Sequence, residues 1–162
     1  MKYFLDTEFY EDGKTIDLIS IGVVCEDGRE FYAVNKDAEL HRVSDWVRKN
    51  VLPQLPPYGH PAWMSRSEIQ HALYYFILDD GKKPEVWGYY ADYDWVVVAQ
   101  LFGTMMDLPK HFPMLCMDLK QLAISVGSQP LPVQNSGEHD AIEDARWNMR
   151  VHQFLTAQGV KQ

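Results

Sequence analysis

The sequence predicts a mixed α/β fold in a single domain, residues 1–162, with helices on both faces of a central sheet. Three observations lead to this prediction. Residues 2–34 hold three strand-like runs joined by turn residues, and from residue 38 onward helical spacing alternates with short strand patterns. The chain also has 162 residues, 46% of them hydrophobic, which suits one packed core. We therefore expect an antiparallel meander that parallel strands extend into a mixed sheet.

The meander is expected from three runs and the turns between them. Residues 2–9 are aromatic-rich and read as a strand, and a turn is expected at 12–13. The run at 17–24 is almost continuously aliphatic, which is typical of a strand covered on both faces. The Asp-Gly pair at 27–28 predicts a hairpin into a third strand at 29–34, because glycine supplies the positive φ that such a turn needs.

The remaining elements follow from changes in hydrophobic period and from breaker residues. Ser65 and Glu68 have the spacing of a capping box, which predicts where one helix begins. In chain order we expect a helix at 38–52, a proline-rich loop at 53–61, a helix from 66 to about 78, a strand at 85–89, a helix at 94–102, a helix at 117–126, a loop at 127–138 and a last helix at about 140–157.

Composition and charge exclude some classes of protein. The 15 basic and 23 acidic residues give a formal net charge of −8, which argues against a protein that coats nucleic acid with a basic face. It leaves open an enzyme whose carboxylates surround divalent cations. No apolar run approaches the roughly 18 residues of a membrane helix, so we expect no membrane segment and a cytoplasmic protein. Cys25 and Cys116 are too few for a zinc cage, and we expect both to be thiols.

Two acids stand close together in the first predicted strand. In Asp6-Thr7-Glu8 the carboxylates are two residues apart, so they project from the same face of the strand. Like charges on an apolar strand repel each other and require water or a bound cation. Taken alone, this tripeptide is more simply explained by an edge strand with a solvated acidic face, so the functional interpretation depends on the acids that follow.

Further acids and a histidine come later in the chain. Asp94 follows the strand expected at 85–89, at the kind of junction where α/β proteins place ligands, although Asp94 or Asp92 could instead cap the next helix. His139 and Asp144 enter the last helix, and they converge only if His139 lies in the loop or first turn. Stabilisation of a helix N-terminus would account for the acid but not for the histidine.

Taken in order, these residues resemble the three motifs of the DEDDh 3′–5′ exonucleases of the ribonuclease H-like superfamily. The segments YFLDTEF, IDLISIGVV and HDAIEDA resemble in particular the compact bacterial 3′-exoribonucleases of the polyadenylate-specific type. One departure is Tyr90, which stands where the second motif usually has asparagine. The sister class with tyrosine in the third motif is excluded, because Asp140 occupies that position.

The resemblance implies a metal-dependent 3′–5′ exonuclease with a two-metal mechanism. Asp6 would bridge two Mg²⁺ or Mn²⁺ ions, Glu8 and Asp144 would serve the ion on the nucleophile side, and Asp94 would act on the other through water. His139 would be the general base. The substrate would be single-stranded nucleic acid, RNA more than DNA, and a homodimer is expected from relatives.

The substrate-binding predictions are Thr7, Phe9 and Tyr90, of which Phe9 is as well explained by packing in the core. Four basic residues are candidates for phosphate contact and equally ordinary surface residues: Lys82, Lys83, Lys110 and Arg146. The alternatives for function are a non-catalytic module that binds nucleic acid or a protein partner on the same fold, a DNA-directed 3′–5′ exonuclease, and an unrelated metal phosphatase.

Overall fold

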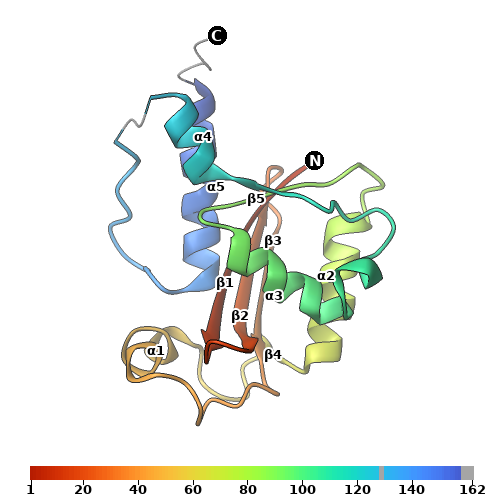
Figure 1. Ribbon diagram of the computed structural model, residues 1–162, viewed down its shortest axis with the longest axis vertical. Coiled ribbons are helices and arrows are strands. Elements are labelled where there is room, and N and C mark those ends of the chain that lie inside the picture. Colours follow the sequence, from red (N-terminus) through yellow and green to blue (C-terminus); the bar gives the residue numbers. More distant parts are fainter. Residues whose placement is uncertain (128–129, 158–162) are drawn as a thin grey trace.

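The fold is seen in a computed structural model that describes residues 1–127 and 130–157 (Figure 1). Residues 128 and 129, inside the loop expected at 127–138, lie outside the described residues, as do residues 158–162. One six-stranded sheet has the order β4-β3-β2-β1-β5-β6. Its strands are β1 (Lys2–Glu11), β2 (Ile16–Cys25), β3 (Glu30–Asn35), β4 (Trp63–Met64), β5 (Glu85–Gly88) and β6 (Cys116–Asp118).

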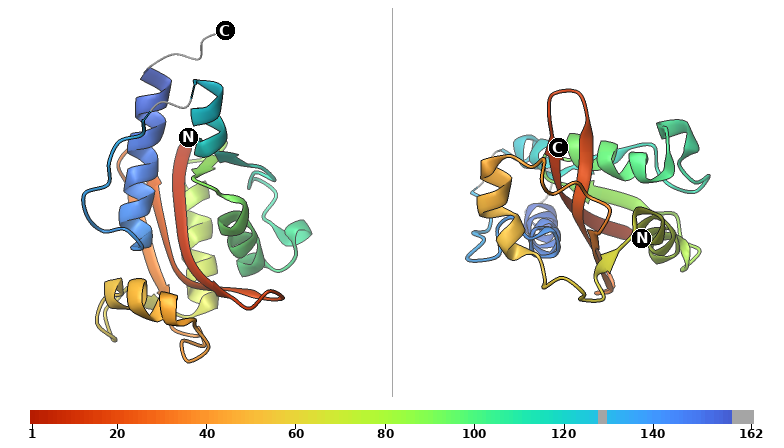
Figure 2. Two further views of the ribbon diagram at one scale, coloured as in Figure 1. Left: turned by 60° about the vertical axis from the view of Figure 1, so that its left-hand side comes forward. Right: turned by 90° about the horizontal axis from the view of Figure 1, so that it is seen from below.

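Helices cover both faces of the sheet, as the sequence predicts (Figure 2). The α-helices are α1 (Asp45–Asn50), α2 (Arg66–Leu78), α3 (Asp92–Phe102), α4 (Leu119–Ser125) and α5 (Ala141–Ala157), with short 3₁₀ turns at η1 (Leu52–Gln54) and η2 (Met105–Asp107). Helices α2 and α3 pack on one face and α4 and α5 on the other, while α1 lies beyond the end of β1 (Figures 1 and 2).

The meander of β1, β2 and β3 is confirmed, with antiparallel pairing throughout. Its register places Asp6 opposite Gly22 and Glu8 opposite Ser20, and a bulge follows between Glu8 and Phe9. Strands β5 and β6 run parallel to β1 on its other side, so the sheet is mixed. Because β1 lies between an antiparallel and a parallel neighbour, its acids stand in the middle of the sheet.

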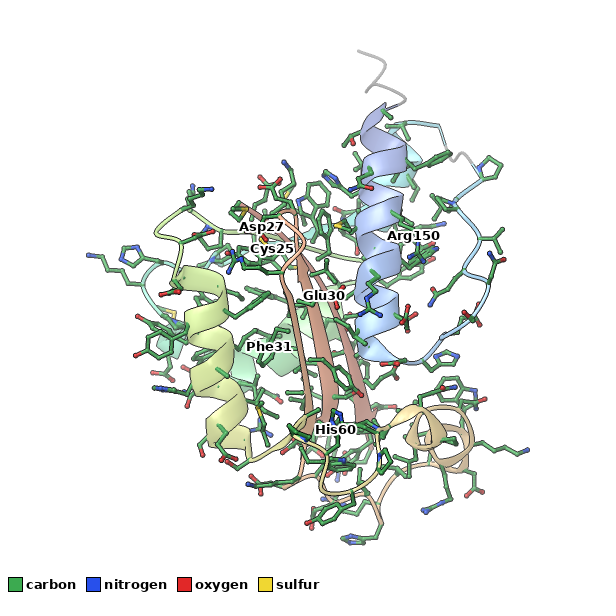
Figure 3. The ribbon with its side chains drawn as sticks, turned by 180° about the vertical axis from the view of Figure 1, so that it is seen from behind. Cys25, Asp27, Glu30, Phe31, His60 and Arg150 are labelled. Carbon is green, nitrogen blue, oxygen red and sulfur yellow. The ribbon has the colours of Figure 1, made fainter. Side chains whose placement is uncertain are left out.

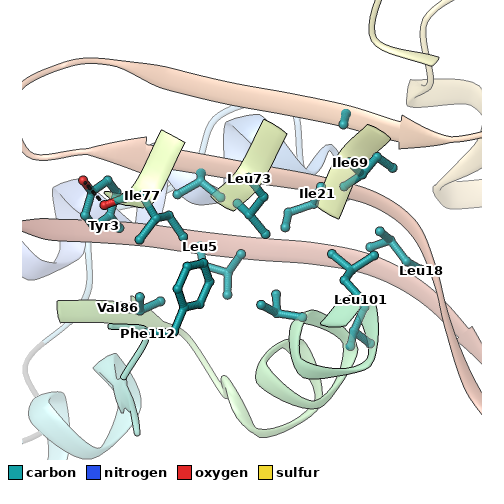
Figure 4. Close-up of a cluster of buried hydrophobic side chains, with 14 of the residues drawn as sticks. Tyr3, Leu5, Leu18, Ile21, Ile69, Leu73, Ile77, Val86, Leu101 and Phe112 are labelled. Carbon is teal, nitrogen blue, oxygen red and sulfur yellow. Dashed lines mark hydrogen bonds between the residues drawn. The ribbon is translucent and has the colours of Figure 1, made fainter. Parts of the chain in front are cut away.

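The alternation of side chains along β1 divides the core. Tyr3 and Leu5 point into the larger cluster, which α2 and α3 close, whereas Phe4 points into the cluster under α4 and α5. Seen from behind, α2 and α5 flank the strands, and Glu30 of β3 lies beside α5 (Figure 3). Figure 4 shows the larger cluster, in which Phe112 lies next to Val86. These two clusters fix α3 and α5 on opposite faces of one strand.

The helix predicted at 38–52 is wrong over most of its length. Helix α1 has six residues and begins after Ser44, whose side chain accepts a hydrogen bond from the Val47 backbone N–H. The chain before Ser44 forms turns, such as the one closed by the Arg42 N–H on the Glu39 carbonyl. Val43 and Val47 still pack in one small cluster, so the helical spacing reflected burial rather than helix.

Three other boundaries differ from the predictions. The helix expected at 117–126 begins at Leu119, because residues 116–118 pair with β5 as strand β6. Helix α3 begins at Asp92, two residues early, so Asp94 lies inside its first turn. Strand β4 has only two residues and was not expected from the sequence. Among the described residues, no helix is both long and apolar enough to cross a membrane.

Candidate active site

Asp6 and Glu8 lie in the half of β1 that leads toward α1, on the face of the sheet that α5 covers. Burial and the nearby charges of Asp94, Asp144, Glu8 and Asp140 raise the pKa of Asp6 well above its ordinary value. All five acids therefore act on one region, although they come from β1, α3 and the start of α5. Glu8 and Asp144 come closest together, with His139 beside them, while Asp6 and Asp94 act on them through charge.

Asp94 approaches from the other side of β1. Its side chain is 6% exposed, and its Oδ1 accepts hydrogen bonds from the Thr7 backbone N–H at 2.8 Å and the Thr7 hydroxyl at 2.6 Å. Burial raises the pKa of Asp94 to about 6, while the bonds from Thr7 oppose that rise. Thr7 stands between Asp6 and Glu8 in the sequence, so it ties helix α3 to the acidic strand segment.

Helix α5 reaches the acids because its first turn touches the sheet. Gly22 is the cause: a Cβ there would lie 2.2 Å from the Ala141 carbonyl oxygen. Ala141 and Ala145 are both fully buried in this first part of α5. Since Gly22 pairs with Asp6, the contact places Asp144, on the first turn of α5, beside the β1 acids.

His139 lies just before α5, in the loop position that the sequence required for convergence. Its backbone has φ 67°, in the left-handed region, after Gly137 at φ 76°. This turn brings the His139 N–H to 2.9 Å from Asp144 Oδ2. The exposed indole of Trp46, in α1, packs edge-on against the imidazole with ring centroids 4.8 Å apart. Helix α1 therefore forms one wall beside His139.

One potential ligand atom each from Glu8, His139 and Asp144 lies within 4.8 Å of the other two. Burial and the charges of Asp144 and Asp94 raise the pKa of Glu8 to about 8, and burial raises the pKa of Asp144. Over residues 1–127 and 130–157, none of the ion pairs involves Asp6, Glu8, Asp94 or Asp144. No lysine or arginine of the described residues therefore neutralises these acids, and hard oxygen donors in this number fit divalent cations such as Mg²⁺ or Mn²⁺.

The family model described as the 3′-5′ exoribonuclease Rv2179c-like domain matches residues 1–156. The chain belongs to this family. Two members from Mycobacterium tuberculosis, the 3′-5′ exoribonucleases Rv2179c (strain H37Rv) and MT2234.1 (strain CDC 1551), are each 44% identical over 158 residues, which cover 97% of this chain and 94% of theirs. The predicted exonuclease family and enzyme class are confirmed.

Two solved structures share the fold with this exoribonuclease-family chain. Pop2p of S. pombe, in a form with Mg²⁺ and Mn²⁺ bound, superposes with a TM-score of 0.64 at 11% identity over 98% of this chain and 83% of Pop2p. A 3′-exonuclease described for its recognition of a histone mRNA stem-loop superposes with a TM-score of 0.70 at 9% identity over 99% of this chain and 83% of that one. The expected ribonuclease H-like fold is confirmed.

Several side chains that position the site of this family member were missed by sequence reasoning. Gln134 donates to Asp144 Oδ1 at 2.6 Å, and the Asn148 amide donates to the Leu5 carbonyl at 2.8 Å, one residue before Asp6. Asp118 accepts the Ala91 N–H at 2.9 Å and so holds the loop before α3. Only tertiary contacts reveal these three. Gly22 did carry a signal, since glycine inside a strand often marks a close backbone approach.

The three substrate-binding predictions fall in different surroundings. Thr7 is buried and bonded to Asp94, as described above. Phe9 is partly buried and stacks on Tyr93 with ring centroids 5.8 Å apart. Tyr90 is 61% exposed, has φ 55° and lies 6.0 Å from the Lys120 ammonium. Exposure therefore makes Tyr90 the most accessible of the three to a ligand. All three stay predictions.

Proposed function

We propose that this chain is a divalent-metal-dependent 3′–5′ exoribonuclease that releases nucleotides from the ends of single-stranded RNA. Its residues 1–162 would form a single exonuclease domain. One observation carries the proposal: potential ligand atoms of Glu8, His139 and Asp144 lie within 4.8 Å of one another, in a carboxylate cluster that pairs with no lysine or arginine among the described residues. The family match supports the reaction direction and the RNA substrate.

Asp6, Glu8, Asp94 and Asp144 would hold two Mg²⁺ or Mn²⁺ ions, a choice supported by the ions bound to Pop2p. Bound there, the ions would mask phosphate charge, lower the pKa of the attacking water and stabilise the leaving oxygen. The protein's part is to fix the four carboxylates. Thr7 orients Asp94, while Gln134 and the His139 N–H each hold one oxygen of Asp144.

His139 would accept the proton of the attacking water. An imidazole nitrogen can accept a proton from water within hydrogen-bond reach, which suits a general base at this step. Its backbone is tied to Asp144, and the Trp46 indole supports one edge of the ring. A side chain held between a wall and a metal ligand needs little reorganisation before proton transfer.

The terminal nucleotides would be held by stacking, because unpaired bases bind aromatic faces with little sequence preference. The exposed Tyr90 ring is one candidate, and the stacked pair of Phe9 and Tyr93 is another. The buried Thr7 would act through Asp94 or through its main chain. A homodimer stays a prediction that sedimentation would test.

The test uses single-stranded RNA and DNA oligomers of one sequence, labelled at the 5′ end, with Mg²⁺, Mn²⁺ or EDTA. A descending ladder with either ion, faster on RNA and absent in EDTA, is expected. Asp144→Asn should abolish the ladder, and Asp92→Asn is the matched control because Asp92 is an exposed acid in the first turn of α3. Binding of RNA without cleavage, or hydrolysis of phosphomonoesters alone, would overturn the proposal.

A further inference from the structure

A cavity lies near the end of β1 that is opposite to the acidic cluster. It has a volume of about 610 Å³ and is lined by the C-terminal half of α2 and by the loops before β5 and β6. Strand β5, which follows one of these loops, begins beside Lys2, the first residue of β1. The cavity therefore lies near the amino end of β1. About six residues, at roughly 3.3 Å each, separate Lys2 from Glu8, which places the acids on the order of 20 Å away.

Three exposed lysines surround this cavity: Lys82, Lys83 and Lys110. Within the described part of the chain none of them forms an ion pair with a carboxylate. Arg146 differs, because it is paired with Glu30 and Glu143. In a protein with net charge −8, a cavity with three uncompensated cations is a local site for an anion.

The walls of the cavity are apolar and aromatic. Tyr74 is 37% exposed, and its ring is parallel to that of Phe112 within 9°, with centroids 6.5 Å apart. Phe112 is buried in the larger core cluster beside Val86 (Figure 4). The Tyr75 ring packs edge-on against Tyr74, with centroids 5.2 Å apart, so the partly exposed Tyr74 ring is held in place and can receive a planar ligand at little entropic cost.

The backbone around the lysines is held by the rest of the fold. The amino group of Met1 donates to the Lys83 carbonyl at 3.0 Å, and the Lys82 N–H donates to Asp80 Oδ1 at 2.8 Å. The other oxygen of Asp80 accepts from Tyr3 and Arg29, so Asp80 does not neutralise the lysines. The cations therefore stand on a supported loop and remain available.

We propose that this cavity is a second nucleotide site, in which the lysines bind a phosphate and Tyr74 stacks on the base. An apolar cavity of this size with a few charged groups at its rim has the form of a small-molecule site. The same chemistry could come from a free nucleoside monophosphate or from a nucleotide inside an RNA strand. The proposal does not depend on the catalytic assignment of the carboxylates.

The experiment follows backbone amide shifts of the full chain by NMR in EDTA, with AMP, inorganic phosphate or adenosine added. AMP should move the amides of residues 81–83 and 110–112 and bind more tightly than phosphate or adenosine. The double variant Lys82→Ala/Lys110→Ala should lower the affinity for AMP about tenfold. The control Lys14→Ala/Arg150→Ala removes the same charge from exposed sites elsewhere, and it should change the affinity for AMP less than about twofold. Tyr74→Leu should lower the affinity for AMP but leave the affinity for inorganic phosphate unchanged.

A short and a long oligoribonucleotide then separate the two sources. Shifts that saturate with AMP identify a free nucleotide as the ligand, and shifts that need the long oligomer identify the RNA strand. AMP or RNA affinity that is equal in the wild type and the lysine variant would overturn the site. Phosphate binding as tight as AMP binding, with no effect of Tyr74→Leu, would overturn its nucleotide character.

Discussion

The two ends of β1 carry opposite charges and differ in how those charges are solvated. At the amino end, Lys82, Lys83 and Lys110 are exposed, so water screens their repulsion. Toward the other end, Asp6 and Glu8 are half-buried beside the nearly buried Asp94, and burial raises their pKa values. The lysines therefore cost the fold little, whereas burial of the charged acids destabilises it. Charged groups whose burial destabilises the fold in the absence of a ligand are stronger evidence of a functional site than solvated charges are.

Gly22→Ala should have the largest effect, because the new Cβ would collide with the Ala141 carbonyl and lift α5 from the sheet. We expect a loss of about 3 kcal/mol, which lowers Tm by about 10 °C, and a fall in nuclease rate of about a hundredfold as Asp144 moves. Thermal unfolding and the RNA ladder measure both. Ser20→Ala is the control for thermal unfolding only, because Ser20 is opposite Glu8 and its buried hydroxyl has no hydrogen-bond partner among the described residues. Wild-type activity in Gly22→Ala would break the proposed link between sheet contact and site.

The acidic end should make the metal-free protein less stable as pH rises. The folded pKa of Glu8 is about 8 against an ordinary 4.5, so between these values the folded state binds a proton that the unfolded state releases. Stability is then lost as pH rises through this window, and Tm in EDTA should fall from pH 5 to pH 8. Saturating Mg²⁺ at pH 8 should raise Tm by about 5 to 10 °C. Glu8→Gln should flatten the pH profile, and an unchanged profile would contradict the electrostatic account.

Asp118 offers a smaller test, since it supports the site without belonging to the acidic cluster. Asp118→Ala removes the acceptor for the Ala91 N–H and the cap of α4 through the Gln121 N–H. We expect a loss of about 1 kcal/mol, a Tm drop of about 2 to 4 °C and a severalfold fall in kcat because Asp94 loosens. Asp118→Asn keeps one acceptor oxygen and should lie between. A kcat equal to that of the wild type in both variants would leave Asp118 with a purely structural role.

Tyr3→Phe should have the smallest functional effect, because it acts at the lysine end of the same strand. The Tyr3 hydroxyl donates to the Ile77 carbonyl at 3.0 Å and to Asp80 at 3.2 Å. Its loss should cost about 1 kcal/mol, or about 2 to 4 °C in Tm, with RNA cleavage unchanged. Unfolding and cleavage assays on one preparation would show whether the two ends of β1 are independent.

The order of elements along the chain was largely predictable, and the failures have physical causes. The Asp-Gly hairpin defined β2 and β3, and the Ser65 capping box located α2. Strand β6 is three residues long, and its apolar pattern merges with the helix that follows. The segment 36–44 carries helical spacing, yet turns form there because packing rather than helix propensity buries Val43.

Within the candidate site, the presence and order of the acids and the histidine could be read from the sequence, but the residues that position them could not. The i and i+2 spacing of Asp6 and Glu8 follows from strand geometry alone. Gln134 and Asp118 meet their partners only through tertiary folding, and nothing local in the sequence distinguishes them from surface residues. Next to Tyr90, which departs from the second motif, the Ala91 N–H is held by Asp118 at the end of another strand.

The left-handed backbone at His139 limits which exchanges there can be interpreted. His139→Ala would both remove the imidazole and strain the main chain. Loss of activity in this variant would therefore not show that the imidazole transfers a proton. Asparagine adopts this conformation far more readily and also lacks a usable base. A mutational survey of this position should therefore separate shape from chemistry, with asparagine and glycine folding well and β-branched residues failing even to assemble the turn.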